Sequence, residues 1–357
     1  MRIVRGWLRG ALRTAGLPVC PPARGRSEVR VGIVIVNYRT ADLVVGCLRS
    51  LADELGRGDE IGVVVVDNAS GDGSLETLRG AVESHGWSSW CEVVNAGRNG
   101  GFAFGNNVGA RRVLSWERPA EAVHFLNPDT YVRPEAVRLL AAFLESRPGV
   151  GIVGSGLENP DATVRRGAFR FPGAISEIES QLWFGPVSRL LRRWVVAPPA
   201  RQDAWRVDWV TGASMMVRRE ALERVGGFDD AYFLYFEETD LCLRVARAGW
   251  EIWQEPASRV VHLVGQSTGV NRRGERPRPK PGYWYDSRRL YFEKNYGRAR
   301  ADLADACRCC GVVASRVLGA VLGRHGDRTI TVDGVLSARR RLRSAERSGM
   351  AAGAAAS

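Results

Sequence analysis

The stretch Val31–Asn37, VGIVIVN, is the strongest indication of the fold, and the rest of the chain is interpreted from it. Almost all of its residues are apolar and most are β-branched, which is typical of a strand buried on both faces of a parallel sheet. The next segment, 41–55, has the spacing of an amphipathic helix, and 62–66 has the composition of a second buried strand. This order of elements predicts a βαβ unit.

The alternation of strands and helices continues through the first half of the chain. We expect further strands at 91–95 and 122–126, and helices ending near residue 85 and over 101–115 and 134–146, the last with a proline at its start. The chain has 357 residues, 45% of them hydrophobic, which is enough for one large domain or two ordinary ones. These features predict a doubly wound α/β sheet flanked by helices.

The second half of the chain is less regular. The segment 157–206 mixes aromatic residues, prolines and arginines without a period, so we interpret it as an irregular insert, such as a flap on the acceptor side. After it we expect a strand at 209–217, helices at 219–225 and 237–248, strands at 251–254 and 259–262, and an amphipathic aromatic segment at 283–296. Basic helical sequence follows, and the alanine-rich end is predicted to be disordered.

Polar residues follow each strand of the first half, at 37–38, 67–68, 95–101 and 127–130. Ligands of such sheets bind beyond the carboxyl ends of the strands, so we place the functional site at this edge, although the same residue types are also favoured in turns. The glycine loop 95–101 could offer backbone N–H groups to a diphosphate, with help from Arg98. It matches neither a Walker A loop nor the dinucleotide fingerprint.

Three carboxylates, Glu237, Glu238 and Asp240, follow the aromatic run 232–236. They could occupy the first turn of a helix, where the dipole favours negative charge, with Asp240 and Arg244 as an i,i+4 pair. They could also form a site, because concentrated charge beside apolar bulk is costly unless it is used or compensated. Both interpretations fit the residues alone.

Two further residues at strand ends suit a cation. Asp129 follows a buried strand, and one carboxylate can hold Mg²⁺ if a substrate diphosphate supplies further oxygens. His262 ends a predicted strand, where a histidine is more often structural than metal-binding. No GxSxG motif and no Cys–His pair indicates a nucleophile.

Several motifs in a fixed order resemble the family 2 inverting glycosyltransferases of GT-A fold, in particular their rhamnosyltransferase-like branch. The motifs are VIVNY (34–38), VVDNASGDGS (65–74), NGGFAFGNNVG (99–109), LNPDT (126–130), TGASMMVR (211–218) and GGFDD…FEETDLCLR (226–244). The resemblance covers about residues 31–296. It implies a doubly wound mixed sheet flanked by helices, the GT-A architecture, followed by a C-terminal helical extension.

The resemblance also assigns roles to residues. Glu238 stands at the position of the catalytic base, with Asp240 as the alternative base, and His262 resembles a further metal ligand of some members. Asp129 matches the last residue of the family's DxD motif. Asn127 replaces the first Asp of that motif, so the metal site has one negative charge fewer. The residues implied on the donor side are Asn37, Asp67, Arg98, Asn99, Gly100, Asn107, Asn127 and Asp129, and those on the acceptor side are Trp209, Gly212, Phe236 and Glu237.

The implied activity is inverting transfer of a hexose, such as rhamnose, from a dTDP- or UDP-linked donor to a glycan, lipid-linked or small-molecule acceptor. The cofactor would be Mg²⁺ or Mn²⁺. One alternative is an inactive GT-A-like protein that binds sugar nucleotides or membranes. Another is a nucleotidyltransferase, which would need an activating Lys or Arg in a glycine loop after the first strand, and the turn 37–40 lacks that loop.

The charge is strongly positive, with a net charge of +12 and a pI near 9.9. Arginines crowd the start, a proline-rich loop at 272–280 and the end, which suits an anionic membrane surface but is also typical of a GC-rich genome. No nucleic-acid-binding module is recognisable, so nucleic acid is not expected as a partner. Residues 1–17 have the pattern of an amphipathic surface helix, and a frayed basic tail fits them equally well.

No apolar run reaches the roughly 18–20 residues that a membrane span needs. The seven cysteines are odd in number and scattered; a metal site at Cys307, Cys309 and Cys310 would lack partner ligands, and reduced thiols suit a cytoplasmic protein. We therefore expect a cytoplasmic protein at the inner face of the cell membrane. The expected divisions are a basic segment 1–30, a catalytic domain 31–265 with halves 31–155 and 156–265, a helical extension 266–345 and a tail 346–357.

Overall fold

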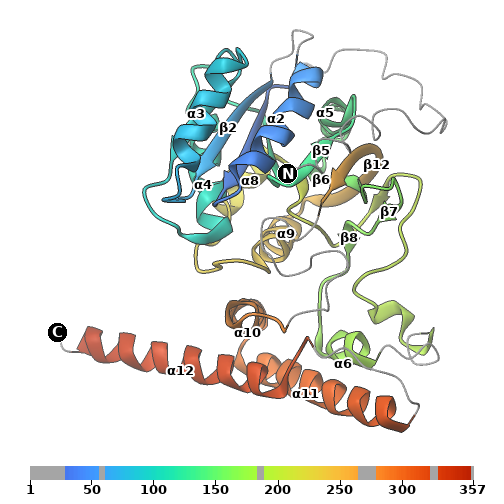
Figure 1. Ribbon diagram of the computed structural model, residues 1–357. Coiled ribbons are helices and arrows are strands. Elements are labelled where there is room, and N and C mark those ends of the chain that lie inside the picture. The colour runs from blue at the N-terminus through green and yellow to red at the C-terminus, as the bar shows by residue number, and fades with distance from the viewer. Residues whose placement is uncertain (1–28, 56–60, 183–188, 264–278, 322–328, 355–357) are drawn as a thin grey trace.

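The computed structural model describes residues 29–55, 61–182, 189–263, 279–321 and 329–354 (Figure 1). The strands are β1 (Val31–Asn37), β2 (Ile61–Asp67), β3 (Cys91–Asn95), β4 (Ala122–Leu126), β5 (Thr130–Val132), β6 (Val150–Glu158), β7 (Val164–Arg165), β8 (Ala168–Phe169), β9 (Trp205–Arg206), β10 (Trp209–Val210), β11 (Ser214–Arg218) and β12 (Glu251–His262). The helices are α2 (Ala41–Leu55), α3 (Ser74–Ser84), α4 (Gly101–Leu114), α5 (Ala136–Ser146), α6 (Ala174–Leu182), η1 (Arg192–Trp194), α8 (Arg219–Val225), α9 (Glu237–Arg247), α10 (Gly282–Tyr296), α11 (Arg298–Val321) and α12 (Val332–Ala354).

A mixed sheet of 10 strands forms the centre of the described chain. Its order is β3-β2-β1-β4-β11-β6-β12-β5, and β7 and β9 add to β6 and β12. The first four strands run parallel, as the apolar runs predicted, so their carboxyl ends share one edge. β11 runs antiparallel to both of its neighbours, which makes the sheet mixed.

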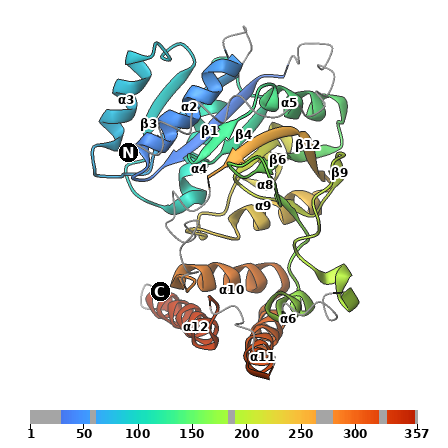
Figure 2. The same ribbon diagram turned by 45° about the vertical axis from the view of Figure 1, so that its right-hand side comes forward.

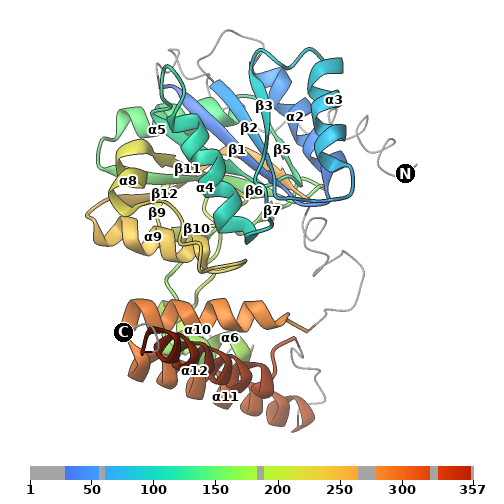
Figure 3. The ribbon, with the colours of Figure 1, turned by 90° about the vertical axis from the view of Figure 1, so that its left-hand side faces the viewer.

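Helices cover both faces of this sheet (Figures 1 and 3). α2, α3 and α5 pack on one face, where Ile33 and Ile35 are fully buried, and α4, α8 and α9 pack on the other, where Val34 is fully buried. Each fully buried aliphatic side chain of this kind stabilises the fold by about 1.5–3 kcal/mol. The strand Val31–Asn37 is apolar throughout because both of its faces are covered.

The C-terminal helices form a separate layer, which Figure 2 shows below the sheet and its flanking helices. α10, α11 and α12 pack around their own buried residues, among them Tyr285, Val312 and Val335. α6 joins this layer by packing along α11, although it comes from the segment interpreted as an irregular insert. The helical layer, defined as α6, α10, α11 and α12, is therefore built from two distant parts of the sequence.

Several elements differ from expectation. The strands expected at 251–254 and 259–262 are one strand, β12, whose register shifts around Pro256, a residue that cannot donate to the ladder. The strand expected at 209–217 is divided into β10 and β11 by a turn at 211–213, and β5 was not expected. α5 begins at Ala136 rather than at Pro134, and α12 extends to Ala354, into the tail expected to be disordered.

The basic segment 1–28 and all but the end of the 272–280 cluster lie outside the described residues. Among the described helices, none is both long enough and apolar enough to cross a bilayer.

Candidate active site

Asp67 ends β2 with its carboxylate already held in place. Its Oδ1 accepts hydrogen bonds from Asn37 Nδ2 (2.7 Å) and Ser70 Oγ (2.6 Å), and its Oδ2 accepts one from the Ser70 backbone N–H (3.1 Å). Asn37 is fully buried, and its Oδ1 accepts hydrogen bonds from Thr40. Asn37 and Asp67 therefore form a preorganised corner. Ser70 and Thr40 were not predicted, although local side-chain bonds of this kind are typical of Asx and Ser/Thr turns.

The glycine loop before α4 is shaped by its own side chains. Asn99 Oδ1 accepts hydrogen bonds from Asn68 Nδ2 and the Gly101 N–H, both at 3.1 Å. The Gly97 N–H is bonded to Asn95 Oδ1, and the Phe102 N–H to a carbonyl. The N–H groups of Gly97, Gly101 and Phe102 are thus already used within the protein, and the expectation that this loop offers N–H groups to a diphosphate stays a prediction for its other residues.

Of the other predicted donor residues of this loop, Gly100 is half-buried and Arg98 is exposed. Gly100 is the residue before α4, and the Arg98 guanidinium lies 4.2 Å from the centre of the Phe104 ring. Arg98 is exposed and brings positive charge to the site without being buried in it.

Gly101 joins this loop to the aromatic run. Its φ is +88°, and a Cβ there would lie 2.1 Å from the Phe233 carbonyl oxygen, which accepts the Phe102 N–H at 2.8 Å. We expect Gly101→Ala to lower the unfolding free energy by about 1–3 kcal/mol, because it forces a strained conformation and a clash. Gly80→Ala is the control, since nothing lies within 4 Å of its Cβ position in α3. Equal melting temperatures for the two variants would contradict this role.

Asn107 was predicted to bind the donor, and the structure corrects this. Its Nδ2 donates to the Phe228 carbonyl (2.8 Å) and to Asp230 Oδ1 (2.6 Å), and its Oδ1 accepts the Phe228 N–H (2.9 Å). All of its bonds are directed to the loop before the aromatic run. Asn107 therefore positions that loop.

Asp129 and His262 meet where β4 and β12 end. The distance from His262 Nε2 to Asp129 Oδ1 is 3.2 Å, and pairing of β12 with β5 sets His262 opposite Thr130. Among the described residues, Asn127 Oδ1 and His262 Nδ1 are buried without a hydrogen-bond partner. Carboxylate, amide oxygen and imidazole are suitable ligands for Mg²⁺ or Mn²⁺.

This pair is not a complete metal site by itself. Within the described ranges, no group of three or more His, Cys, Asp or Glu side chains could hold a metal ion. The residues present therefore fit a cation that takes most of its remaining ligands from a substrate diphosphate and water, which is how Mg²⁺ is usually bound.

Arg165 of β7 was not predicted from the sequence. Burial lowers the pKa of its guanidinium, and the charge of Asp129 works in the opposite direction, so the two groups interact. Strand pairing sets Arg165 opposite Leu157, and Leu157 opposite Val260, close to the end of β12. A half-buried guanidinium here suits a diphosphate. No sequence signal separates it from the many other arginines of 157–206.

Glu237 and Glu238 begin α9. In the described chain the Oε2 atom of each is buried without a hydrogen-bond partner. Burial raises the pKa of Glu238 to about 7, against the opposing effect of the N–H groups at the start of α9. Burial, and then the charge of Glu238, raise the pKa of Glu237 well above its usual range. Burial thus favours the neutral form of Glu237, while Glu238, with a pKa near neutrality, can exchange a proton, as a general base must.

The turn at 211–213 connects the two sides of the site. A Cβ added to Gly212 would lie 3.8 Å from Glu238 Cβ, and the Asn127 N–H donates to the Ala213 carbonyl at 3.1 Å. This turn thus lies between Glu238 and the strand end that bears Asp129.

The aromatic run ends in an unusual backbone. Tyr235 and Phe236 both have positive φ, at 72° and 68°, which is rare for bulky residues and marks stored strain. α10 holds the run in place, since Tyr235 stacks on Tyr283 and Phe236 packs on Trp284. The ring of Phe236 thus packs on the helical layer, and its position on the acceptor side stays a prediction.

Trp209 was also predicted on the acceptor side. Its ring stacks on Phe169 with centroids 4.3 Å apart, and its Nε1 donates to the Arg170 carbonyl at 2.9 Å. Its polar group is thus used by the residue that follows β8. Of the residues predicted on the acceptor side, Gly212 and Glu237 lie next to Glu238.

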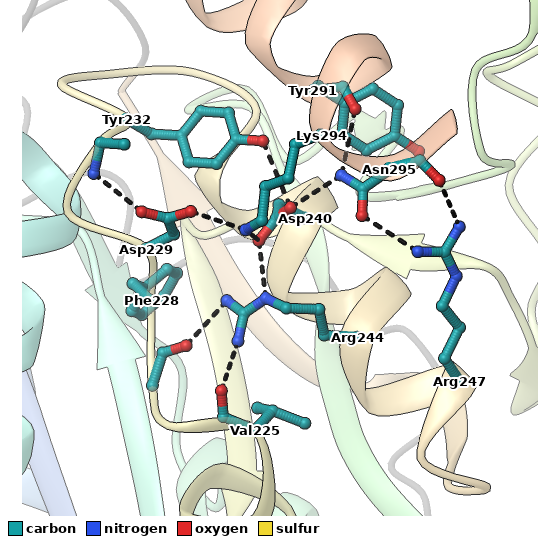
Figure 4. A network of polar contacts seen from close by, with 12 residues as sticks. Val225, Phe228, Asp229, Tyr232, Asp240, Arg244, Arg247, Tyr291, Lys294 and Asn295 are labelled. Carbon is teal, nitrogen blue, oxygen red and sulfur yellow. Dashed lines mark hydrogen bonds and ion pairs between the residues drawn. The ribbon is translucent and has the colours of Figure 1, made fainter. Parts of the chain in front are cut away.

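Asp240 is fully buried in a saturated network (Figure 4). Its Oδ2 accepts hydrogen bonds from Arg244 Nε (2.7 Å) and Lys294 Nζ (2.9 Å), and its Oδ1 from Asn295 Nδ2 (2.8 Å) and Tyr232 Oη (3.2 Å). Burial favours a raised pKa for Asp240, but Asn295, Arg244 and Lys294 outweigh it and hold the pKa below its usual value. The assignment of Asp240 as an alternative base is corrected: it connects α9 to α10.

The fold and this site define a class of protein. A polar corner and a cation-binding pair at one sheet edge, with a basic carboxylate across a short turn, suit group transfer from a nucleotide-linked donor. Residues 29–276 match the model of the family described as Glycosyltransferase like family 2, and the chain belongs to this family. It is a glycosyltransferase, which confirms the resemblance seen in the sequence.

Two curated relatives are rhamnosyltransferases. The N-acetylglucosaminyl-diphospho-decaprenol L-rhamnosyltransferase of Mycobacterium tuberculosis is 28% identical over 250 residues, covering 66% of this chain and 77% of that protein. Rhamnosyltransferase WbbL of Escherichia coli is 27% identical over 166 residues, covering 46% of this chain and 61% of that protein. The predicted rhamnosyltransferase-like branch is thereby confirmed.

A solved structure confirms the predicted GT-A fold. The mannosyltransferase PcManGT from Pyrobaculum calidifontis, in complex with GDP-Man and Mn²⁺, superimposes with a TM-score of 0.54 at 18% identity. The match covers 95% of this chain and 87% of that one. At this level of identity it shows the fold alone.

Proposed function

We propose that this glycosyltransferase moves its sugar with inversion, and that Glu238 is the general base. The observation that carries the proposal is the position of Glu238. Its carboxylate is buried with a pKa of about 7, and it lies beside the turn 211–213, whose other end is bonded to the strand end bearing Asp129. A base and a diphosphate-binding group on opposite sides of one turn suit a single displacement.

In this mechanism the donor nucleoside binds at the Asn37–Asp67 corner, and Arg165 and Arg98 contribute positive charge toward the diphosphate. The acceptor hydroxyl gives its proton to Glu238 as its oxygen bonds to the anomeric carbon. The bond from that carbon to the diphosphate oxygen breaks on the opposite face. One displacement inverts the configuration of the sugar.

Asp129 and His262 would hold the divalent cation, Mg²⁺ or Mn²⁺. A bound cation would neutralise charge on the departing nucleoside diphosphate. Asn127 provides an amide oxygen where a second carboxylate would add a charge, so we expect weaker cation binding than at a site with two carboxylates.

We propose a dTDP- or UDP-linked hexose as donor, with dTDP-rhamnose as the first candidate because two relatives are rhamnosyltransferases. The acceptor would be a glycan, lipid-linked or small-molecule hydroxyl. The decaprenol-linked acceptor in the name of the mycobacterial relative supports the lipid-linked class. With such an acceptor the protein would be cytoplasmic and peripheral at the inner face of the membrane.

A donor screen tests this proposal. The full chain is incubated with dTDP- and UDP-linked hexoses, with Mg²⁺ or Mn²⁺, and binding and hydrolysis are measured. We expect one nucleotide class to bind, and Asp129→Ala to lower turnover at least ~10²-fold because charge on the leaving group is no longer stabilised. Asp161→Ala, an exposed acid, is the control. Absence of binding for every sugar nucleotide would overturn the proposal.

A further inference from the structure

The outward side of α11 carries an apolar stripe. Its exposed residues, spaced mainly by three and four, are Leu303, Ala306, Cys310, Val313, Val317 and Val321. Residues with this spacing share one side of a helix. The opposite side is buried in the helical layer, and the stripe itself is exposed, with Val317 at 57% and Val321 at 78%.

Exposed large apolar side chains gather on and around the helical layer. Of those in the described chain, Ile175, Leu190, Trp194, Leu303, Val313, Val317, Val321 and Leu336 lie in or next to this layer, whereas Tyr38, Val164 and Phe233 lie elsewhere. Single exposed apolar residues are ordinary, but a gathered set marks an interaction surface.

Positive charge borders the stripe. Successive residues of a helix are about 100° apart around its axis. This spacing places Arg298 and Arg316 along one border of the stripe and Arg300 along the other, and all three are exposed. α12 adds the exposed residues Arg340, Arg341 and Arg343, each of which also forms an ion pair with an acid of the layer. Arg298 pairs with Glu293 of α10, and the acids of α11, Asp302 and Asp305, pair with arginines of α10 and α12. The acids of α11 therefore do not offset the charges of Arg300 and Arg316 beside the stripe.

We propose that this face of α11 docks on an anionic lipid bilayer, with the stripe at the boundary between headgroups and acyl chains and the bordering arginines at the phosphates. Interfacial helices combine these two features. A second copy of the chain is the poorer occupant, because it would bring arginine borders together without acidic partners. α11 and α12 lie on the side of the molecule remote from the sheet, so docking there leaves the sheet edge accessible (Figures 1 and 3).

The inference rests on the proposed function only in expecting a membrane-borne acceptor, and docking can be measured without turnover. The full chain is floated with vesicles of phosphatidylcholine and phosphatidylglycerol, and with phosphatidylcholine vesicles. We expect the double variant Val313→Asp/Val317→Asp to bind the anionic vesicles at least about tenfold more weakly. The control is Val164→Asp, which changes a valine that is 72% exposed on β7 and should leave binding unchanged.

Three outcomes would overturn the docking surface: unchanged flotation of the double variant, equal binding to both vesicle types, or a lipid-free dimer of the wild type that the double variant abolishes. Leu303→Asp on the same stripe should weaken flotation as well, which guards against a folding defect in one variant. Donor hydrolysis in detergent-free solution separates the two proposals. Lost flotation with unchanged hydrolysis supports docking, whereas retained flotation without hydrolysis of any sugar nucleotide counts against the proposed activity alone.

Discussion

Glu238→Gln is expected to lose transfer by at least ~10²-fold while it keeps donor binding. The amide has nearly the shape of the protonated acid, but it cannot take the proton of the acceptor hydroxyl. The Asn37–Asp67 corner and the Asp129–His262 pair are built from other elements and stay intact. Release of nucleoside diphosphate measures kcat, and calorimetry with the donor measures binding.

The neighbouring residue supplies a matched control. Burial and the charge of Glu238 raise the pKa of Glu237 well above its usual range, which favours its neutral form. Glu237→Gln replaces this carboxyl by an amide of nearly the same shape and should leave kcat close to that of the wild type. Near wild-type turnover in Glu238→Gln would remove Glu238 from its role, and an inactive Glu237→Gln would transfer the role to that residue.

The pH dependence follows from the same pair. A general base acts when deprotonated, and the pKa of Glu238 is raised to about 7, so kcat/KM should rise with pH and level off above that value. The residual activity of Glu238→Gln should lack this acidic limb. Stability should change with pH in the opposite direction to activity. The pKa of each of these glutamates is higher in the folded than in the unfolded protein, so the glutamates stabilise the fold less as the pH rises from the usual carboxyl range through 7.

Much of the first half of the fold could be predicted because its signals are local. β1 is apolar at every position between two covered faces, and its polar end lies where a parallel sheet binds ligands. The three acids at 237–240 are different: the neighbouring residues fit a helix start as well as a site, and only the resemblance to a known family assigned the base to Glu238. The prediction of the fold needs only neighbouring residues, whereas the prediction of the base does not.

The direction of a side chain could not be predicted in the same way. Asn107 and Asp240 have residue types that suit a site, yet both are saturated by partners from loops and helices far along the chain. The sequence contains no signal that Asn295, 55 residues away, donates a hydrogen bond to Asp240. The same holds for α6, whose place in the helical layer depends on side chains more than 100 residues later.

Those side chains form a buried ionic network that fixes the helical layer. Arg288 of α10 is 1% exposed and donates to Glu177 of α6 (2.8 Å) and to Asp305 of α11 (2.6 Å). Arg308 of α11 also donates to Glu177. Burial favours a raised pKa for Glu177, but Arg288 and Arg308 outweigh it and hold the pKa below its usual value. One carboxylate thus joins three helices.

Arg288→Met should lower the free energy of unfolding by about 3–5 kcal/mol, because it leaves buried carboxylates without their main partner. Arg340→Met, in the same layer, is the control: its side chain is 71% exposed and its ion pair with Asp333 is 3.5 Å long, so less than about 1 kcal/mol is expected. Urea unfolding followed by circular dichroism measures both. A loss in Arg288→Met no larger than in the control would contradict the network's role.

The pH dependence separates this network from simple loss of packing. The pKa of Glu177 is lower in the folded than in the unfolded protein. Ionised Glu177 therefore stabilises the fold above the pKa of the unfolded carboxyl, and this stabilisation is lost as the pH falls through the pKa of the folded state. The difference in stability between wild type and Arg288→Met should therefore narrow in acid, where protonated Glu177 no longer needs a cation. A gap that stays constant down to low pH would assign the effect to lost packing of the Arg288 side chain.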